Sequence, residues 1–148
     1  PASVEPVRAF VDREEAQLLV LCAKLEAEVA ELDPSDRPVM LRELGLSESA
    51  LPQVIRRSDA LLQLVTFFTP ASKILQAWTA PQGTKAPQAA GIIHTDFERH
   101  FIRAEVIRTD ALLRCGSEAA ARSQGLLRAE GKDYVVQDGD VIHFRVGT

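Results

Sequence analysis

An unbroken apolar run, LLVLCA at residues 18–23, constrains the fold of this chain more than any other feature. Such a run is typical of a strand buried on both faces of a parallel sheet that helices cover. No second run of this kind lies near it, and the backbone N–H and C=O groups of a lone buried strand would lack partners. We therefore expect the neighbouring strands to lie upstream of Pro1, and the chain to be the end, or another part, of a longer protein.

Helical patterns surround that run. Residues 6–16 place apolar side chains at helical spacing after Pro6. Residues 25–32 and 37–45 predict two further helices, the second ending at Gly45. A longer helix with one apolar face is predicted within residues 47–64, with Ser47 or Ser49 as its cap.

The hydrophobic period changes at Leu64. Short β-rich runs at residues 65–69 and 73–79 predict a hairpin around the break TPAS. The remaining predicted elements are a helix at 86–97 that restarts at a Thr95 to Glu98 capping box, a strand at 101–107, a helix with a loop at 111–125, and strands at 126–130 and 141–146. The order β-β-α-β-(α)-β-β predicts an α+β fold of the β-grasp type.

Charge supports a domain boundary near residue 64. Residues 1 to 64 carry 7 Lys/Arg and 12 Asp/Glu, a net charge of −5, whereas residues 65 to 148 carry 10 and 9, a net charge of +1. We therefore expect two domains, 1–63 and 64–148. The formal charge of −4 for the whole chain gives no general indication of nucleic-acid binding.

Composition excludes several classes of protein. A hydrophobic fraction of 46% is ample for a globular core and argues against disorder. Two cysteines far apart in the sequence do not predict a disulfide scaffold or a zinc site. No window of 18 apolar residues and no basic-then-hydrophobic leader is present, so we expect a soluble cytoplasmic protein with no membrane partner.

The three histidines do not predict a catalytic or metal site. His94 and His100 suit a helix end and an exposed position before a strand, and His143 alternates with Ile142 and Phe144, which predicts the opposite face of the last strand. No H-x-x-x-H pattern and no G-x-S-x-G elbow occurs, so a histidine-dependent hydrolase is disfavoured. Asp138-Gly139-Asp140 is typical of a turn that needs a positive φ.

Several segments together resemble the C-terminal TGS domain of the YchF or Obg-like ATPases, a branch of the P-loop GTPase class. They are TFFT, AWTAPQGTKAPQAAGIIHTDFERHFIRAEVI, CGSEAAAR and LLRAEGKDYVVQDGDVIHFRV, which span residues 64 to 146 almost without interruption. The TGS domain of the family is a β-grasp (ubiquitin-like) module, in agreement with the strand order. The resemblance also implies that a helical linker, and the last strand and helices of the nucleotide-binding α/β domain, precede it.

A weaker resemblance upstream implies a nucleotide-base loop. LLVLCAKLEAEVAELD is similar to the family's last nucleotide-domain strand and the loop after it, whose Ser-Ala-Lys motif contacts the base through backbone N–H groups. The corresponding residues here are Cys22, Ala23 and Lys24. Cys departs from Ser at the first position, but a backbone contact tolerates that change. Lys24 also fits a solvated lysine at a helix start.

The motifs that handle phosphates and select the base are absent from this sequence. It contains no G-x-x-x-x-G-K-[ST] loop and no N-K-x-[DE] motif. The resemblance implies ATP, or GTP, with Mg²⁺ as cofactors of the parent protein, and ATP as the preferred nucleotide. We expect this chain alone to bind none of them and to hydrolyse no ATP.

The resemblance implies that the TGS domain is a recognition module for the ribosome, ribosomal RNA or a protein partner. DNA is not an expected partner. Basic side chains that could contact phosphates are Lys85, Arg99, Arg103 and Lys132, although each also fits a solvated surface. The alternative is a stand-alone regulatory or protein-interaction TGS module without nucleotide chemistry.

Overall fold

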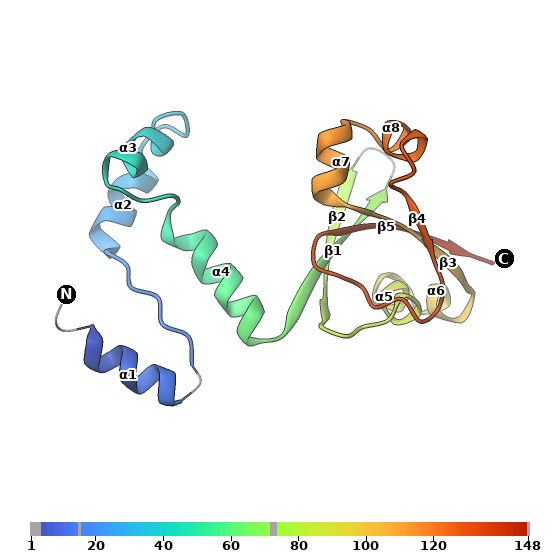
Figure 1. Cartoon of the computed structure of the whole chain (residues 1–148), viewed down its shortest axis with the longest axis horizontal. Helices are drawn as coiled ribbons and strands as arrows, with labels where there is room; N and C mark the ends of the chain where they lie inside the picture. The colour runs from blue at the N-terminus through green and yellow to red at the C-terminus, as the bar shows by residue number, and fades with distance from the viewer. Residues whose placement is uncertain (1–3, 15, 72–73, 148) are drawn as a thin grey trace. The chain divides into compact units, whose positions relative to one another are not determined.

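The computed structural model describes residues 4–14, 16–71 and 74–147. The chain divides into two compact units, Pro1–Leu62 and Gln63–Thr148 (Figure 1). The first unit is helical, and the second contains a sheet with helices. Among the described residues, no helix is long and apolar enough to cross a membrane.

The described residues of the first unit form four helices. They are α1 (Glu5–Arg13), α2 (Ala23–Glu31), α3 (Arg37–Glu43) and α4 (Ala50–Leu61). The guanidinium of Arg37 donates to the carbonyls of Leu32 and Ala30, which fixes the start of α3 against the end of α2. Gly45 follows α3 with a φ of 71°, as its predicted role as a helix stop requires.

The predicted cap of α4 is only partly right. Ser49 is the first flanking residue of the helix, but its side chain makes no capping hydrogen bond. The N–H of Ala50 instead donates to Oε2 of Glu26 at 2.9 Å. A carboxylate on α2 therefore satisfies an N–H that has no partner within α4.

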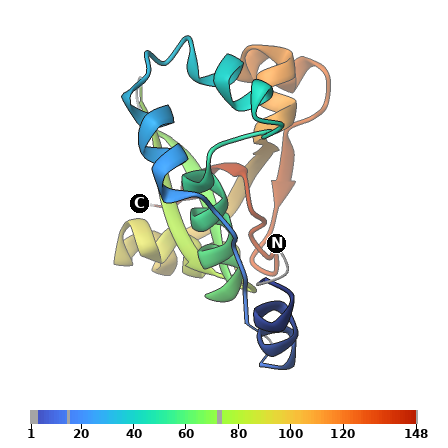
Figure 2. The same ribbon diagram turned by 90° about the vertical axis from the view of Figure 1, so that its left-hand side faces the viewer.

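Residues 18–23, predicted as a strand whose neighbours lie upstream of Pro1, form no strand in this structure. Residues 16–22 have no strand pairing, and α2 begins at Ala23. The segment runs alongside α4 (Figure 2), where the Arg57 guanidinium donates to the carbonyl of Leu18. Val20 and Leu21 are 54% and 47% exposed. A strand requires a partner for its backbone, and the described part of the chain supplies none to this segment.

The second unit is a five-stranded mixed sheet. Its elements are β1 (Leu64–Ala71), β2 (Ile74–Pro81), α5 (Ala86–Ile93), α6 (Thr95–Arg99), β3 (Phe101–Arg108), α7 (Thr109–Cys115), α8 (Glu118–Ser123), β4 (Arg128–Glu130) and β5 (Asp140–Val146). The strand order is β2-β1-β5-β3-β4. Only β1 and β5 pair in parallel, and the other neighbours are antiparallel. This order confirms the predicted α+β, β-grasp class.

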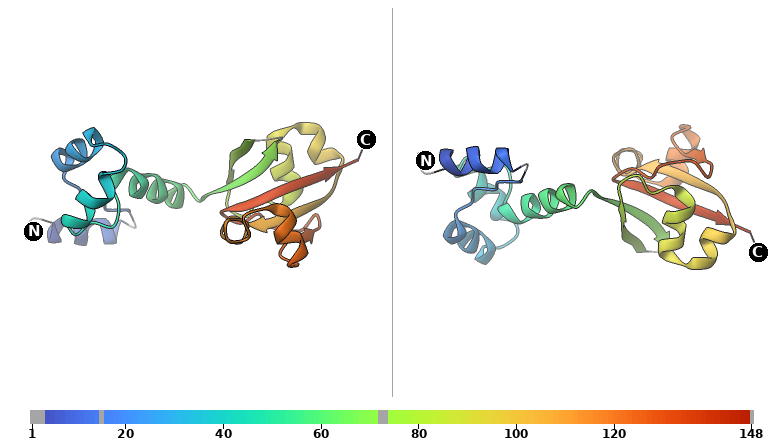
Figure 3. Two further views of the ribbon diagram at one scale, coloured as in Figure 1. Left: turned by 90° about the horizontal axis from the view of Figure 1, so that it is seen from above. Right: turned by 90° about the horizontal axis from the view of Figure 1, so that it is seen from below.

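Two hydrophobic cores lie on opposite faces of the sheet. On one face Phe67, Val106 and Ile142 pack with the alanines of α5, and on the other Ile107 and Val141 pack with α7 and α8. The yellow helices α5 and α6 and the orange helices α7 and α8 accordingly flank the sheet from opposite sides (Figure 3). Alternating side chains along β1, β3 and β5 supply both cores.

Backbone hydrogen bonds join three distant segments at one end of the sheet. The loop before α5 is held because Val136 donates to the carbonyl of Thr84 and Ala86 donates to that of Tyr134. Gly139 has the predicted positive φ, 77°, and its N–H donates to the carbonyl of Thr66 at 2.8 Å. Asp138 Oδ1 accepts from the Thr66 N–H at 2.8 Å. The turn before β5 is therefore fixed to β1.

Hydrogen bonds also hold the buried side chain of Asp140, the residue after this turn. The Tyr134 hydroxyl donates to Oδ2 of Asp140 at 2.6 Å, and the Gln137 N–H donates to the same oxygen at 2.9 Å. Burial, together with the hydrogen bond to Asp140, raises the pKa of Tyr134 to about 12. Tyr134 therefore remains a hydrogen-bond donor at neutral pH.

The break between α5 and α6 differs from the predicted capping box. His94 is the flanking residue of α6, and its Nδ1 accepts from the Asp96 N–H at 3.2 Å. Thr95 is already the first helical residue, so it cannot cap the helix. The extended backbone of His94, with φ −159° and ψ 135°, brings the ring within reach of the first turn.

We expect Phe67→Ala to lower the free energy of unfolding of the second unit by about 3–5 kcal/mol. Phe67 is fully buried and packs edge-on against Phe144, with ring centroids 6.1 Å apart. Urea unfolding followed by the fluorescence of Trp78, the single tryptophan, measures the change. Leu113→Ala is the control, because Leu113 is 76% exposed and should lose no more than about 0.5 kcal/mol. Equal losses for the two variants would contradict the assignment of the core.

Candidate functional site

The predicted base-loop residues lie where α2 begins. Cys22 is exposed, has an extended backbone and directly precedes the helix, of which Ala23 is the first residue. The N–H groups in the first turn of a helix have no acceptor within the helix. Such groups point out of the N-terminal end of the helix, where they can donate to a bound acceptor. The geometry therefore fits hydrogen bonding by main-chain N–H groups at Cys22, Ala23 and Lys24.

The side chain of Lys24 does not add to a closed site in this structure. It is 88% exposed, and its Nζ lies 3.9 Å from Oε1 of Glu28, one turn along α2. An exposed ion pair of this spacing contributes only a few tenths of a kcal/mol. The structure therefore shows Lys24 as a solvated lysine at the start of a helix. Its role in nucleotide binding stays a prediction.

The four basic candidates do not form one surface. Lys85 Nζ lies 2.8 Å from Asp133 Oδ1, which places it beside the neighbouring residue Lys132. Arg99 is on α6, and Phe97 of this helix packs against the core on the α5 face. These three lie apart from Arg103, whose guanidinium is on the α7 face beside Glu105.

A cluster of three arginines around one carboxylate lies on the α7 face of the sheet. Oε1 of Glu105 accepts from Arg103 at 3.0 Å, and Oε2 accepts from Arg145 at 3.0 Å and from Arg122 at 3.3 Å. The Glu105 side chain is only 7% exposed, whereas the three arginines are 47–55% exposed. We call these four residues the Glu105 cluster.

The Glu105 cluster keeps its carboxylate ionised. The hydrogen bond from Arg145, followed by that from Arg103, lowers the pKa of Glu105 to about 2 from an ordinary value of 4.5. The opposing effect of burial is smaller. In the folded chain the carboxylate is therefore ionised at neutral pH and can bind all three guanidinium groups at once.

The sequence contains only part of the signal for this cluster. Arg103 and Glu105 are two residues apart in a predicted strand, so their side chains are expected on the same face of the sheet. The pairing of Arg103 with Arg145 and of Glu105 with His143 depends on the register of β3 and β5. Arg122 reaches the carboxylate from α8, and no spacing rule in the sequence predicts this contact.

Two of the histidines flank α6, and the third is on β5. His94 and His100 interact with the backbone of α6, whereas His143 faces the α7 side of the sheet, opposite Ile142 and Phe144. Within the described ranges, no group of three His, Cys, Asp or Glu residues could hold a metal ion. Nothing in the described structure joins these rings into one site.

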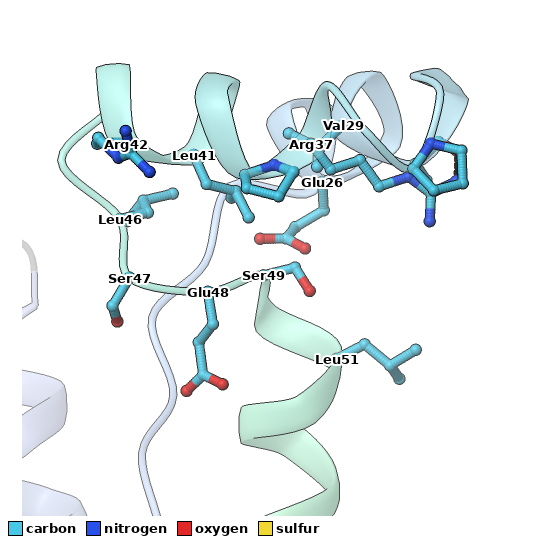
Figure 4. Close-up of a pocket in the computed structure, with 13 residues that line it drawn as sticks. Glu26, Val29, Arg37, Leu41, Arg42, Leu46, Ser47, Glu48, Ser49 and Leu51 are labelled. Carbon is cyan, nitrogen blue, oxygen red and sulfur yellow. Dashed lines mark hydrogen bonds between the residues drawn. The ribbon is translucent and has the colours of Figure 1, made fainter.

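The first unit contains a hollow of about 750 Å³ between α2, α3 and the segment before α4 (Figure 4). Val29, Leu41 and Leu46 contribute apolar surface to it. Three of its charged groups have partners: Glu26 accepts from Ala50, Arg37 donates to backbone carbonyls, and Glu48 pairs with Arg56. This hollow therefore presents mainly apolar surface and no set of groups arranged for catalysis.

Comparison with known proteins decides the family. The model YchF-GTPase_C, described as a protein of unknown function (DUF933), matches residues 64–147. The chain belongs to the YchF family. This confirms the resemblance found in the sequence.

Individual relatives match both units of the chain. The protein named "Ribosome-binding ATPase YchF" of Bacillus subtilis is 50% identical over 143 residues, covering 97% of this chain and 39% of the relative. "Obg-like ATPase 1" of Rattus norvegicus is 43% identical over 144 residues, covering 96% and 36%. The solved YchF GTPase of Schizosaccharomyces pombe matches with a TM-score of 0.80 at 30% identity, covering 96% and 38%. The chain thus spans about two fifths of the length of these YchF-family relatives.

We expect Glu105→Gln to lower the free energy of unfolding at pH 7 by about 1.5–3 kcal/mol, because three charge-assisted hydrogen bonds are weakened. The pKa of Glu105 is lower in the folded than in the unfolded chain, so the unfolded state binds more protons as the pH falls. The stabilisation is complete above about pH 4.5 and disappears as the pH approaches about 2. Urea titrations across this range should therefore show a steeper acid loss for the unmodified chain than for the variant.

Asp133→Asn is the matched control for this experiment. Asp133 pairs with Lys85, but its side chain is 95% exposed, so its removal should cost less than about 1 kcal/mol. A Glu105→Gln variant with no greater loss than this control, or with the same acid profile as the unmodified chain, would contradict the stabilising role of the cluster.

Proposed function

We propose that this chain is the recognition part of a YchF-type ribosome-binding ATPase. The observation that carries the proposal is the 50% identity, over 97% of this chain, to a protein named as a ribosome-binding ATPase. The identity extends through both units, and therefore includes the segment before α2 as well as the sheet domain. On this basis the second unit is a TGS module that contacts the ribosome, and the first unit belongs to the nucleotide-binding part and its linker.

The first unit's proposed contribution to nucleotide binding is at the base. ATP, the nucleotide that the family resemblance favours, presents acceptor and donor atoms on the edge of its base, and exposed main-chain N–H groups can donate to such acceptors. Cys22, Ala23 and Lys24 have this geometry at the start of α2. This chain has no P-loop sequence, so phosphate and Mg²⁺ binding belong to another part of the proposed parent protein.

The second unit's proposed contribution is electrostatic contact with ribosomal RNA. Lys132 is the clearest candidate, because it is exposed beside the Lys85–Asp133 pair and no ion pair engages it in the described structure. Arg99 is also exposed, with a long 4.0 Å contact to Asp96. Arg103 lies apart from these two residues, in the Glu105 cluster on the α7 face of the sheet. Loops and turns on a rigid sheet are common sites of such contacts.

We expect Lys132→Glu to weaken co-sedimentation of this chain with ribosomes by about tenfold and to reduce the salt dependence of binding by roughly one phosphate contact. Arg8→Glu on α1 is the control, because it changes the net charge by the same amount at a residue outside the proposed surface. Ribosome binding should be measured for both variants at several salt concentrations. Equal effects of the two changes would reject a local contact at Lys132.

The absence of ribosome binding by the unmodified chain would favour the alternative, a stand-alone protein-interaction module. Binding that does not respond to salt would also oppose a phosphate contact, since release of counterions makes such contacts depend on ionic strength.

We expect Ala23→Pro to weaken ATP binding about tenfold in a chimera that places this chain after the nucleotide-binding part of the Bacillus subtilis relative. Proline lacks an N–H, but the first position of a helix accepts it, and the extended backbone of Cys22 suits a residue before proline. The helix should therefore persist while one main-chain donor is lost. Titration with a fluorescent ATP analogue measures the affinity.

Cys22→Ser is the control for the base loop. It changes only a side chain and leaves every main-chain donor in place, so binding of the analogue should not change. A large loss for Cys22→Ser, or none for Ala23→Pro with a normal circular dichroism spectrum, would reject a main-chain contact with the base.

A further inference from the structure

A small aliphatic hollow lies beside the Glu105 cluster in the second unit. Its volume is about 180 Å³, and it lies between the β1–β2 hairpin and helices α7 and α8. The aliphatic walls are formed by Pro70, Leu75, Ile107, Leu112, Leu127 and Val141. A hollow of this size accommodates one aliphatic side chain.

The net charge at the rim of the hollow favours a ligand with one negative charge. Glu105 lines the hollow and also holds the three guanidinium groups of its cluster. Glu118 lines it too and lies 3.8 Å from Arg122. Three guanidinium charges against these two carboxylates leave a surplus of one positive charge. The arginines are about half exposed and retain N–H groups for another acceptor.

One polar atom beside the hollow has no partner in the described structure. Nδ1 of His143 is buried and makes no hydrogen bond, although His143 lines the hollow directly opposite Glu105 on the neighbouring strand. A buried polar atom without a partner costs free energy. Nδ1 accepts a hydrogen bond when the ring proton is on Nε2, and in that tautomer a ligand that supplies an N–H is favoured here. The site thus presents an aliphatic surface, an excess positive charge and a hydrogen-bond acceptor.

We propose that this site binds the carboxy-terminal residue of a polypeptide when that residue has an aliphatic side chain. The side chain fills the hollow, the α-carboxylate contacts the arginines, and the last peptide N–H donates to His143. The α-carboxylate and the side chain of a terminal residue are attached to the same Cα, so they must bind close together. The site meets this requirement, because Glu105 both lines the hollow and binds the arginines. The three guanidinium groups are fixed before the ligand arrives, which lowers the entropic cost of binding.

RNA fits the same surface less well. A phosphate could contact the arginines, but His143 is the one lining residue with a ring that could stack on a base, and the other walls are aliphatic side chains and two carboxylates. RNA has no aliphatic group to place there. The hollow and the unpartnered His143 therefore favour a polypeptide, and phosphate binding becomes an outcome of the test.

N-acetyl-L-leucine is the probe for the site, added to the ¹⁵N-labelled 148-residue chain and followed by two-dimensional NMR. We expect saturable shifts at the amides of Leu75, Leu127 and His143 with a Kd of about 1–10 mM, as suits a ligand of this size. N-acetyl-L-leucinamide lacks the negative charge and N-acetyl-L-alanine lacks the larger side chain. Each should bind at least about fivefold more weakly.

Two variants test the two halves of the site. Arg145→Gln should weaken binding of N-acetyl-L-leucine about tenfold. Arg114→Gln, which removes a charge from α7 where Arg114 pairs with Asp110, should leave it unchanged. Leu127→Phe should fill the hollow and prevent binding without lowering the midpoint of thermal unfolding, an effect that a purely structural role of the arginines would not produce.

Three results would overturn the proposal. They are equal binding of the acid and the amide, unchanged binding by the folded Leu127→Phe variant, and shifts confined to residues away from the hollow. A decamer of uridine that shifts the Nε signals of the three arginines, while N-acetyl-L-leucine has no effect, would instead identify a phosphate-binding surface. Ribosome co-sedimentation is not used as a readout, so this test is independent of the proposed ribosome contact.

Discussion

The parallel pairing of β1 with β5 joins the two halves of the sheet, and the rest of the second unit depends on it. The pairing is short, at Phe67 with Asp140 and Phe68 with Val141. On one side of it lies the hairpin that begins the unit, and on the other lie the antiparallel strands β3 and β4. Both cores span this junction, because Phe67 packs on one face and Phe68 on the other. The bonds from the turn at residues 138–139 to Thr66 set its register.

Local patterns were sufficient to predict most of this fold. The hairpin, the helix after it and the last strand each have a hydrophobic period that one segment displays by itself. The positive φ of Gly139 was also predictable from a local pattern, because a glycine between two aspartates is typical of a turn that needs a positive φ. The capping box at Thr95 was predicted wrongly, because either His94 or Thr95 could be the last residue before the helix. In the structure that residue is His94, and Thr95 is already helical.

Contacts between distant segments were not predictable in this way. The Glu105 cluster unites two strands and a helix, and the hollow beside it depends on how α7 and α8 pack on the sheet. Residues 18–23 also show that a local pattern does not determine contacts between distant segments. Their composition is that of a buried strand, yet the segment is extended beside α4, because strand structure depends on a neighbour and not on composition alone. The family, by contrast, was recognisable from continuous sequence segments.

Sharing one carboxylate among three arginines has a consequence for sequence change at these positions. Each guanidinium lowers the cost of burying Glu105, so the loss of one arginine alters what the other two contribute. Replacements at residues 103, 122 and 145 should therefore not be tolerated independently of one another. Once Glu105 itself is replaced, Glu118 beside Arg122 offsets only part of the repulsion among the three arginines, and selection would then favour the loss of their charges as well.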